Sequence, residues 1–230
     1  MMPAFRRRVS VTGPFRMIPA AAGLALALLA PTLVEAQDLE PSLTYMLPVY
    51  CRYTQYFRDR MPGGNNRAEI DRWTELMGDT FNHMHHYCLG LMASNRAAFL
   101  SNTPEDRKHN LGVSIKEFDY VIDRAPANFS MLPEILTKKG ESLIQLDRPG
   151  EGIVELEQAI RIKADYSPAY AAMSDYYKGA GQLAKAHEWL QKGLSEAPNS
   201  PALMRRLAAL DGRKDKGKTS QGPERKPAAP

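Results

Sequence analysis

The residues most able to do chemistry lie close together in the first half of the chain. The segment His83-Met84-His85-His86-Tyr87-Cys88 holds three imidazoles and a thiol, and a second cysteine, Cys51, lies upstream. On a helix His85 and Cys88 are three positions apart and share a face. Imidazole with soft sulfur suits Cu(I), or zinc where more ligands are available. One hypothesis is therefore a metal site formed by His83, His85, His86 and Cys88.

Most other cofactor and catalytic patterns are missing from the sequence. There is no Cys-x-x-Cys-His haem attachment and no His-Glu-x-x-His protease signature. Helical histidines and methionines are common axial ligands, so a bound haem stays an option beside the metal site. Asn65-Asn66 after Gly63-Gly64 fits a helix start, and Asp71 with Glu75 fits a solvated helix face. We therefore expect no enzyme and no cofactor, with a metal- or haem-linked redox accessory protein as the alternative.

The amino terminus has the order of an export signal. Four arginines within residues 6–16 precede the apolar run Met17–Ala30, and Val34-Glu35-Ala36 follows. This order is typical of a secretory signal peptide, here 1–36, that is cleaved after Ala36. The run is short for a membrane span, which needs about 20 apolar residues. We predict a periplasmic or secreted protein, with membrane association only through an uncleaved amino-terminal segment.

Two cysteines in an exported chain favour a disulfide between Cys51 and Cys88, with two separate buried thiols as the alternative. The segments 43–60 and 79–100 are each expected to be a helix, and antiparallel packing would bring Tyr50-Cys51 and Tyr87-Cys88 together. In this interpretation the histidine segment packs against aromatic side chains and binds no metal. These aromatic residues are Trp73, Phe57 and Tyr53.

The net charge of +4 does not indicate a nucleic-acid-binding protein. The segment 1–36 contains four arginines and one glutamate, which leaves 26 of the 30 basic and 25 of the 26 acidic residues from Gln37 onward. Nucleic-acid binding thus loses its main electrostatic support. The segment 211–230 has six basic and three acidic residues among Gly, Pro, Ser, Thr and Ala, and we expect a disordered basic tail.

The second half of the chain repeats itself, because 133–166 and 167–200 align without a gap at a period of 34. In the second unit the large and small residues follow the spacing W-x2-L-G-x2-Y and then A-x3-F…P, which resembles the tetratricopeptide repeat. The first unit is the weaker copy, since Lys139 and Gly152 depart from the expected residue types. The matching residues are Tyr170, Met173, Ser174, Tyr177, Ala186, Leu190 and Pro198, and in the first unit Leu136, Gly140, Leu143, Leu156 and Ala164.

The resemblance implies an all-α fold, a short right-handed superhelix of antiparallel helix pairs. In the repeat region 131–210 the expected helices are 133–146, 150–163, 168–179 and 183–196, followed by a cap helix 201–210. The amino-terminal region 37–130 is expected to be helical but not repetitive. Thr103 and Pro104 should begin a helix that ends near Arg124. A degenerate repeat is also expected at the end of that region, with a loop too long for the pattern, from Cys88-Leu89-Gly90 to Ser114, Phe118 and Pro126.

The resemblance also implies a function, that of an exported scaffold or adaptor for a partner protein or peptide in an envelope assembly. On that model the concave face is lined by exposed residues of the first helix of each unit and extended by the cap helix. The mixed charge of this face argues against a clamp for a peptide carboxylate. Whether the protein forms homo-oligomers stays open. The candidate peptide-binding residues are Thr137, Lys138, Glu141, Gln145, Ala171, Asp175, Lys178, Arg205 and Arg206.

Overall fold

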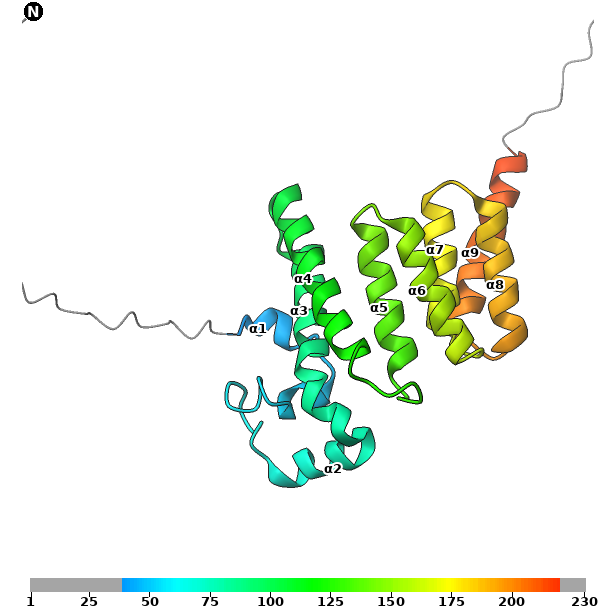
Figure 1. Ribbon diagram of the computed structural model, residues 1–230. Coiled ribbons are helices and arrows are strands. Elements are labelled where there is room, and N and C mark those ends of the chain that lie inside the picture. The colour runs from blue at the N-terminus through cyan, green and yellow to red at the C-terminus, as the bar shows by residue number, and fades with distance from the viewer. Residues whose placement is uncertain (1–38, 220–230) are drawn as a thin grey trace, which may run out of the picture. The chain divides into compact units, whose positions relative to one another are not determined.

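The computed structural model describes residues 39–219, except for the side chains of 213–219, so the predicted signal peptide lies outside the described residues. Within this range every regular element is a helix and there is no strand, which confirms the all-α class (Figure 1). No helix of the described part is long and apolar enough to cross a membrane. The helices are α1 Pro41–Thr44, η1 Val49–Tyr53, α2 Arg67–Met77, η2 Gly78–His83, α3 Met84–Phe99, α4 Pro104–Ile122, α5 Leu132–Gln145, α6 Pro149–Ile162, α7 Ser167–Gly179, α8 Leu183–Glu196 and α9 Pro201–Thr219.

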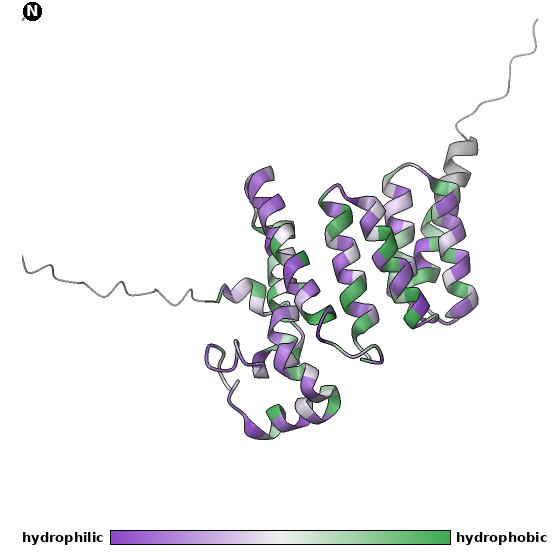
Figure 2. Ribbon diagram, in the orientation of Figure 1, coloured by the Kyte–Doolittle hydropathy of each residue, from purple (hydrophilic) through white to green (hydrophobic). Residues whose placement is uncertain are grey.

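Neighbouring helices pack in pairs, α3 with α4, α5 with α6, and α7 with α8 (Figure 1). Successive pairs also touch, through α4 with α5 and α6 with α7, and α9 covers α7 and α8. Figure 2 shows polar and apolar residues alternating along α5 to α8, as expected of helices with one buried face. The predicted boundaries in 131–200 agree with the structure within one residue. The right-handed superhelix remains a prediction.

The first repeat unit depends on the close approach of α5 and α6. A Cβ atom added at Gly140 would lie 2.9 Å from the carbonyl oxygen of Gly152, and one added at Gly152 would lie 2.7 Å from that of Gly140. Real side chains do not tolerate such contacts with backbone. Gly152 departs from the repeat pattern because the two backbones meet at this point.

Lys139, the other departure from the pattern, joins three helices. Its Nζ lies 2.6 Å from Asp119 Oδ1 on α4 and 2.8 Å from Glu155 Oε1 on α6. Burial works to lower the pKa of Lys139, but the hydrogen bonds to the two carboxylates outweigh it, and the pKa is raised. A charged residue thus stands where the repeat pattern has a large apolar one, and it joins the first unit to α4.

The region expected to hold a degenerate repeat consists of two long helices, α3 and α4, joined by a short connection. The connection between α3 and α4 spans only 100–103, so the predicted long loop is wrong. The extra residues lengthen the helices, since α3 has 16 residues and α4 has 19, against 14 in α5. Gly90 lies directly against Phe118, whose ring atom is 2.5 Å from where a Cβ would be. The start of α4 is as predicted, because Thr103 Oγ1 accepts a hydrogen bond from the Asp106 N–H.

The prediction of one helix over 43–60 is wrong. The chain there forms α1, the short 3-10 helix η1 and a series of turns. Pro48 has no N–H to donate and disfavours helical geometry at the residue before it. Thr54 is extended at ψ 158°, and its hydroxyl donates to the Cys51 carbonyl oxygen. In the predicted helix 79–100, only Met84–Phe99 is α-helical, because η2 comes first.

The carboxy-terminal cap helix is longer than predicted. α9 continues from Leu210 to Thr219, so the first nine residues of the predicted disordered tail are helical. Residues 220–230 lie outside the described part of the chain. The buried face of α9 includes Leu203 and Leu210, which pack in a core cluster with Tyr170 and Leu190.

Candidate functional site

A groove of about 510 Å³ lies along α5 and α7, the first helices of the two repeat units. Glu141 and Asp175 occupy equivalent positions one repeat apart, and each supplies a carboxylate. Apolar surface lies between them, supplied chiefly by Ile144, Ala172 and Tyr176. The groove is lined by Glu141, Ile144, Gln145, Ala172, Asp175, Tyr176, Gly179 and Ala180.

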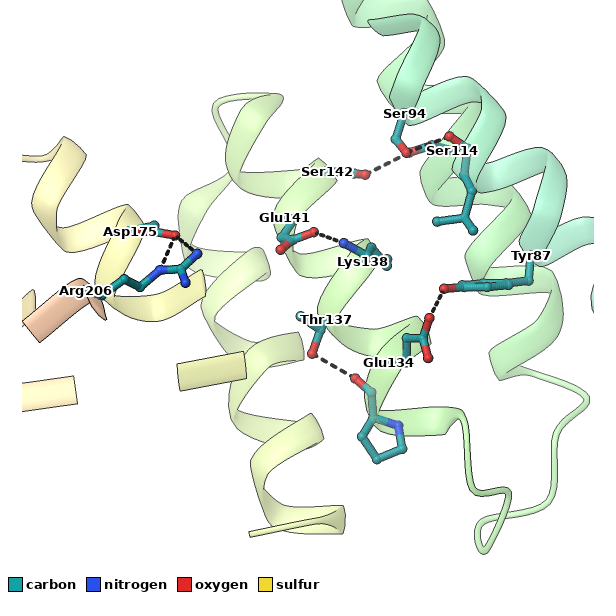
Figure 3. Close-up of polar contacts among 12 residues, drawn as sticks. Tyr87, Ser94, Ser114, Glu134, Thr137, Lys138, Glu141, Ser142, Asp175 and Arg206 are labelled. Atoms are coloured by element: carbon teal, nitrogen blue, oxygen red, sulfur yellow. Dashed lines mark hydrogen bonds and ion pairs between the residues drawn. The ribbon is translucent and has the colours of Figure 1, made fainter. Parts of the chain in front are cut away.

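A basic side chain accompanies each of these carboxylates (Figure 3). Lys138 Nζ lies 2.9 Å from Glu141 Oε2, one turn away on α5. Arg206, on α9, donates from Nε and Nη2 to Asp175 Oδ2 over 3.0 and 2.9 Å. All four side chains are more than a third exposed, so each ion pair stabilises the fold by at most about 1 kcal/mol. These pairs therefore set the charge of the groove more than its stability.

A third cation, Arg107, reaches the same region from α4. Its Nη1 donates to the carbonyl oxygen of Gln145 over 3.1 Å, and its Nη2 donates to Gln145 Oε1 over 3.0 Å. The first bond satisfies a carbonyl at the end of α5, where a positive charge is favourable. Sequence reasoning missed Arg107, because nothing in the pattern places α4 beside the end of α5.

The structure brings together five of the nine predicted peptide-binding residues. Glu141, Gln145 and Asp175 line the groove, and Lys138 and Arg206 bond to its carboxylates. Lys178 and Arg205 do not line it. The apolar residues were missed because the candidates were chosen among positions expected to be exposed. The signal available in the sequence was the spacing of Ile144, Ala172 and Tyr176 beside those positions.

Thr137 and Ala171 were wrongly predicted to be exposed. They are 2% and 6% exposed, and they occupy equivalent positions one turn before Glu141 and Asp175. The Thr137 hydroxyl donates to the Pro133 carbonyl oxygen within α5 (Figure 3). α5 and α7 contact one another directly.

The predicted disulfide is present, because Cys51 and Cys88 are bonded. Both residues are fully buried in a core that includes Phe57 and Tyr87, with Trp73 and Tyr53 packed against it. A bonded sulfur is not a thiolate, so Cys88 as a metal ligand is wrong. Met84, Tyr87 and Cys88 lie in this core as expected, whereas His83 and His86 contact Tyr120 of α4 instead.

The histidines next to Cys88 have partners other than a metal. His86 Nδ1 lies 2.6 Å from Glu117 Oε2 on α4, and the His86 ring stacks on Tyr120 at 3.6 Å between centroids. His83 meets the same tyrosine edge-on. Within the described residues no three His, Cys, Asp or Glu side chains are arranged to hold a metal ion.

The neighbouring His85 has a buried ring nitrogen and a lowered pKa. Burial lowers its pKa from 6.5, and the neighbouring His86 ring lowers it further. Its Nδ1 is buried and finds no hydrogen-bond partner among the described side chains and backbone. The neutral imidazole is therefore favoured at this position.

Tyr87 links the disulfide region to the repeats. Its hydroxyl donates to Glu134 Oε1 on α5 over 2.6 Å (Figure 3). Burial raises the pKa of Tyr87 well above the usual value, and the neighbouring Tyr50 and Glu134 raise it further. The phenol therefore stays protonated and keeps donating. Through this contact α3 holds the beginning of α5, the helix that lines the groove.

The comparisons with known proteins leave the family open. No protein-family model matches this sequence, and none of the curated proteins is significantly similar to it.

Proposed function

We propose that this chain is an exported adaptor that holds a short segment of a partner protein in the groove between α5 and α7. The observation that carries this function is the groove itself, which runs over equivalent positions of two consecutive helical units. It lies on the face that the tetratricopeptide resemblance assigns to ligands. Five of the residues expected from that resemblance line the groove or bond to it.

The lining favours a particular kind of segment. Ile144, Ala172 and the Tyr176 ring offer apolar contact to one bulky side chain of the partner. Glu141 and Asp175 offer carboxylates on the two sides of that contact, already balanced by Lys138 and Arg206. A basic side chain of the partner would share these carboxylates. We therefore propose an occupant with a bulky apolar residue close to a lysine or arginine.

An exported location fits the disulfide. Disulfides persist in oxidising compartments and are rare where glutathione keeps thiols reduced. The periplasm is the location proposed here, with the predicted cleavage after Ala36 as its sequence basis. The alternative role in redox or metal chemistry has less support, because Cys88, the only cysteine among its proposed ligands, is bonded to Cys51.

The test is photo-crosslinking in the producing cell. Gly179 lines the groove at the end of α7, and a Cβ atom added there meets no atom within 4 Å. Gly150, at the start of α6, has the same open surroundings but lies outside the groove. A photoreactive phenylalanine derivative is placed at one or the other position. Adducts should form at 179 and be absent at 150.

The adduct is informative only if its contact is mapped. Mass spectrometry of the crosslinked peptide should place the contact in one segment with a bulky apolar and a basic residue. The charge reversal Asp175→Lys should abolish the adduct. Equal crosslinking at 179 and 150 would contradict the proposed function. So would an adduct at 179 that still forms in the Asp175→Lys variant.

A further inference from the structure

A second cleft, of about 610 Å³, lies at the beginning of the described chain. It is formed by α1, the turn that follows, and the loop 60–62. Most of the lining is apolar, and two arginines, Arg52 and Arg60, also line it. The apolar residues of the lining include Leu39, Leu47, Val49 and Met61. The cleft is far in sequence from the groove of α5 and α7 and shares no residue with it.

Large apolar side chains are exposed beside this cleft. Tyr45 is 89% exposed, Val49 61% and Met46 48%, all within five consecutive residues. Of the other exposed large apolar residues in the described part, Phe99 and Leu100 are adjacent, and the rest, such as Leu76 on α2 and Val154 on α6, lie singly in the sequence. Single exposed apolar residues are ordinary on a protein surface, whereas a cluster of them marks an interaction site.

Arg52 and Arg60 add positive charge beside these apolar residues, and contacts with Tyr56 hold Arg60 in position. The Arg60 guanidinium lies 4.2 Å from the centre of the Tyr56 ring and donates to the Tyr56 carbonyl oxygen over 2.7 Å. Arg52 is exposed on the same cleft. Glu40, the residue before α1, does not line the cleft, and its carboxylate accepts a hydrogen bond from the Ser42 hydroxyl. We call Tyr45, Met46, Val49, Arg52 and Arg60 the N-terminal patch.

In the sequence, this patch follows closely after the predicted signal peptide. Only eight residues, 31–38, separate the apolar run Met17–Ala30 from Leu39. A chain of that length reaches at most about 30 Å. While the run is engaged with a bilayer during export, the N-terminal patch is therefore held near the membrane surface.

We infer that the N-terminal patch docks on the surface of an anionic lipid bilayer. Tyrosine and aliphatic side chains favour the interface between headgroups and acyl chains. Arginines at the same level attract lipid phosphates, by about 1 kcal/mol each. No described helix is able to span, so this is a contact with the surface. It adds a second membrane contact to the one expected from an uncleaved amino terminus, and it does not depend on what the groove binds.

A tryptophan reporter in the full chain tests this contact. Tyr45→Trp places the fluorophore in the patch, and Leu76→Trp places one at a similarly exposed apolar position of α2. Each protein is mixed with phosphatidylglycerol vesicles whose acyl chains are brominated, and wild type corrects for Trp73 and Trp189. Because bromine quenches only at short range, the Tyr45→Trp signal should be quenched and the Leu76→Trp signal should not. An uncleaved amino-terminal segment would anchor both proteins alike, so it would not create this difference.

Lipid charge and Arg52 supply the second part of the test. Arg52→Gln should raise the vesicle concentration needed for half-maximal quenching about fivefold, and phosphatidylcholine vesicles should quench less. Absence of quenching at position 45, or equal quenching at 45 and 76, would overturn the inference. A dimer of wild type that Tyr45→Ser dissociates in solution would also overturn it, because a second copy would then cover the patch.

Discussion

Arg206 of α9 holds Asp175 of α7 through two nitrogens, at 3.0 Å from Nε and 2.9 Å from Nη2 to the same carboxylate oxygen. The pair is 31 residues apart in sequence. It makes the last helix part of the groove, because it determines how much negative charge Asp175 presents to a ligand. Lys138 has the same relation to Glu141, but within α5.

Removing Arg206 should therefore strengthen the binding of a basic partner segment, while removing the charge of Asp175 should weaken it. Arg206→Gln leaves the carboxylate without its cation, and Asp175→Asn leaves no carboxylate. Because the pair is partly exposed, both variants should change the free energy of unfolding by less than about 1 kcal/mol. Titration of the mapped segment by calorimetry checks the two signs. Effects in the same direction for both variants would contradict this role.

Reducing the disulfide should lower stability considerably. The bond between Cys51 and Cys88 closes a loop with a sequence separation of 37 residues. The chain-entropy estimate for such a loop is about 4 kcal/mol. Urea unfolding with and without reductant measures it, and the double variant Cys51→Ser, Cys88→Ser serves as a control that reductant should leave unchanged. A reductant effect below about 1 kcal/mol would show that packing alone holds this region.

Gly140→Ala should destabilise the protein by about 1–3 kcal/mol, because the new methyl group would overlap the backbone of Gly152. The matched variant is Gly179→Ala, also on the first helix of a repeat unit, where a Cβ meets nothing within 4 Å. That change should be neutral or stabilising by up to about 1 kcal/mol. Thermal unfolding of the two proteins compares them. Equal effects would mean that α5 and α6 are not in close contact here.

The protein should lose stability as pH falls below about 6.5, partly through His85. Burial lowers the pKa of His85 in the folded state, so between 6.5 and that lower value the unfolded chain binds a proton that the folded chain does not. Stability is therefore complete above the unfolded pKa and decreases on acidification. His85→Gln should reduce the difference between urea midpoints at about pH 7.5 and about pH 5. His109→Gln, at an exposed position of α4, should leave that difference unchanged.

The repeat region was predictable because local signals there agree with each other. Pro149, Pro168 and Pro201 lie at helix starts, and Gly181, with φ 73°, marks the turn after α7. Apolar periodicity supplies the rest, so the boundaries of α5 to α8 followed from the sequence. The lysine at position 139 of the first unit could not be explained from the sequence. Its contacts with α4 and α6 in the structure explain it.

The predictions failed at positions where tertiary contacts determine the local structure and burial. Residues 43–60 are rich in aromatic and apolar side chains, but Pro48 and the bond of Cys51 to α3 hold them in turns. Thr137 and Ala171 have the right spacing for a concave face, yet both are buried, and Ala171 belongs to a core cluster with residues of α8 and α9. Such burial depends on how two helices meet, and helical spacing alone does not determine it. The disulfide was predictable from compartment chemistry, whereas the pairing of His86 with Glu117 was not.

The most direct test of the central claim is the affinity of the mapped partner segment, as a synthetic peptide, for two tryptophan variants. Gly179→Trp fills the groove at a position with open space, and Gly150→Trp makes the same change outside it. We predict that Gly179→Trp weakens peptide binding at least about tenfold, a loss of about 1.4 kcal/mol, while Gly150→Trp binds as wild type does. Unchanged affinity in Gly179→Trp, with both variants folded, would contradict the assignment of the groove as the binding site.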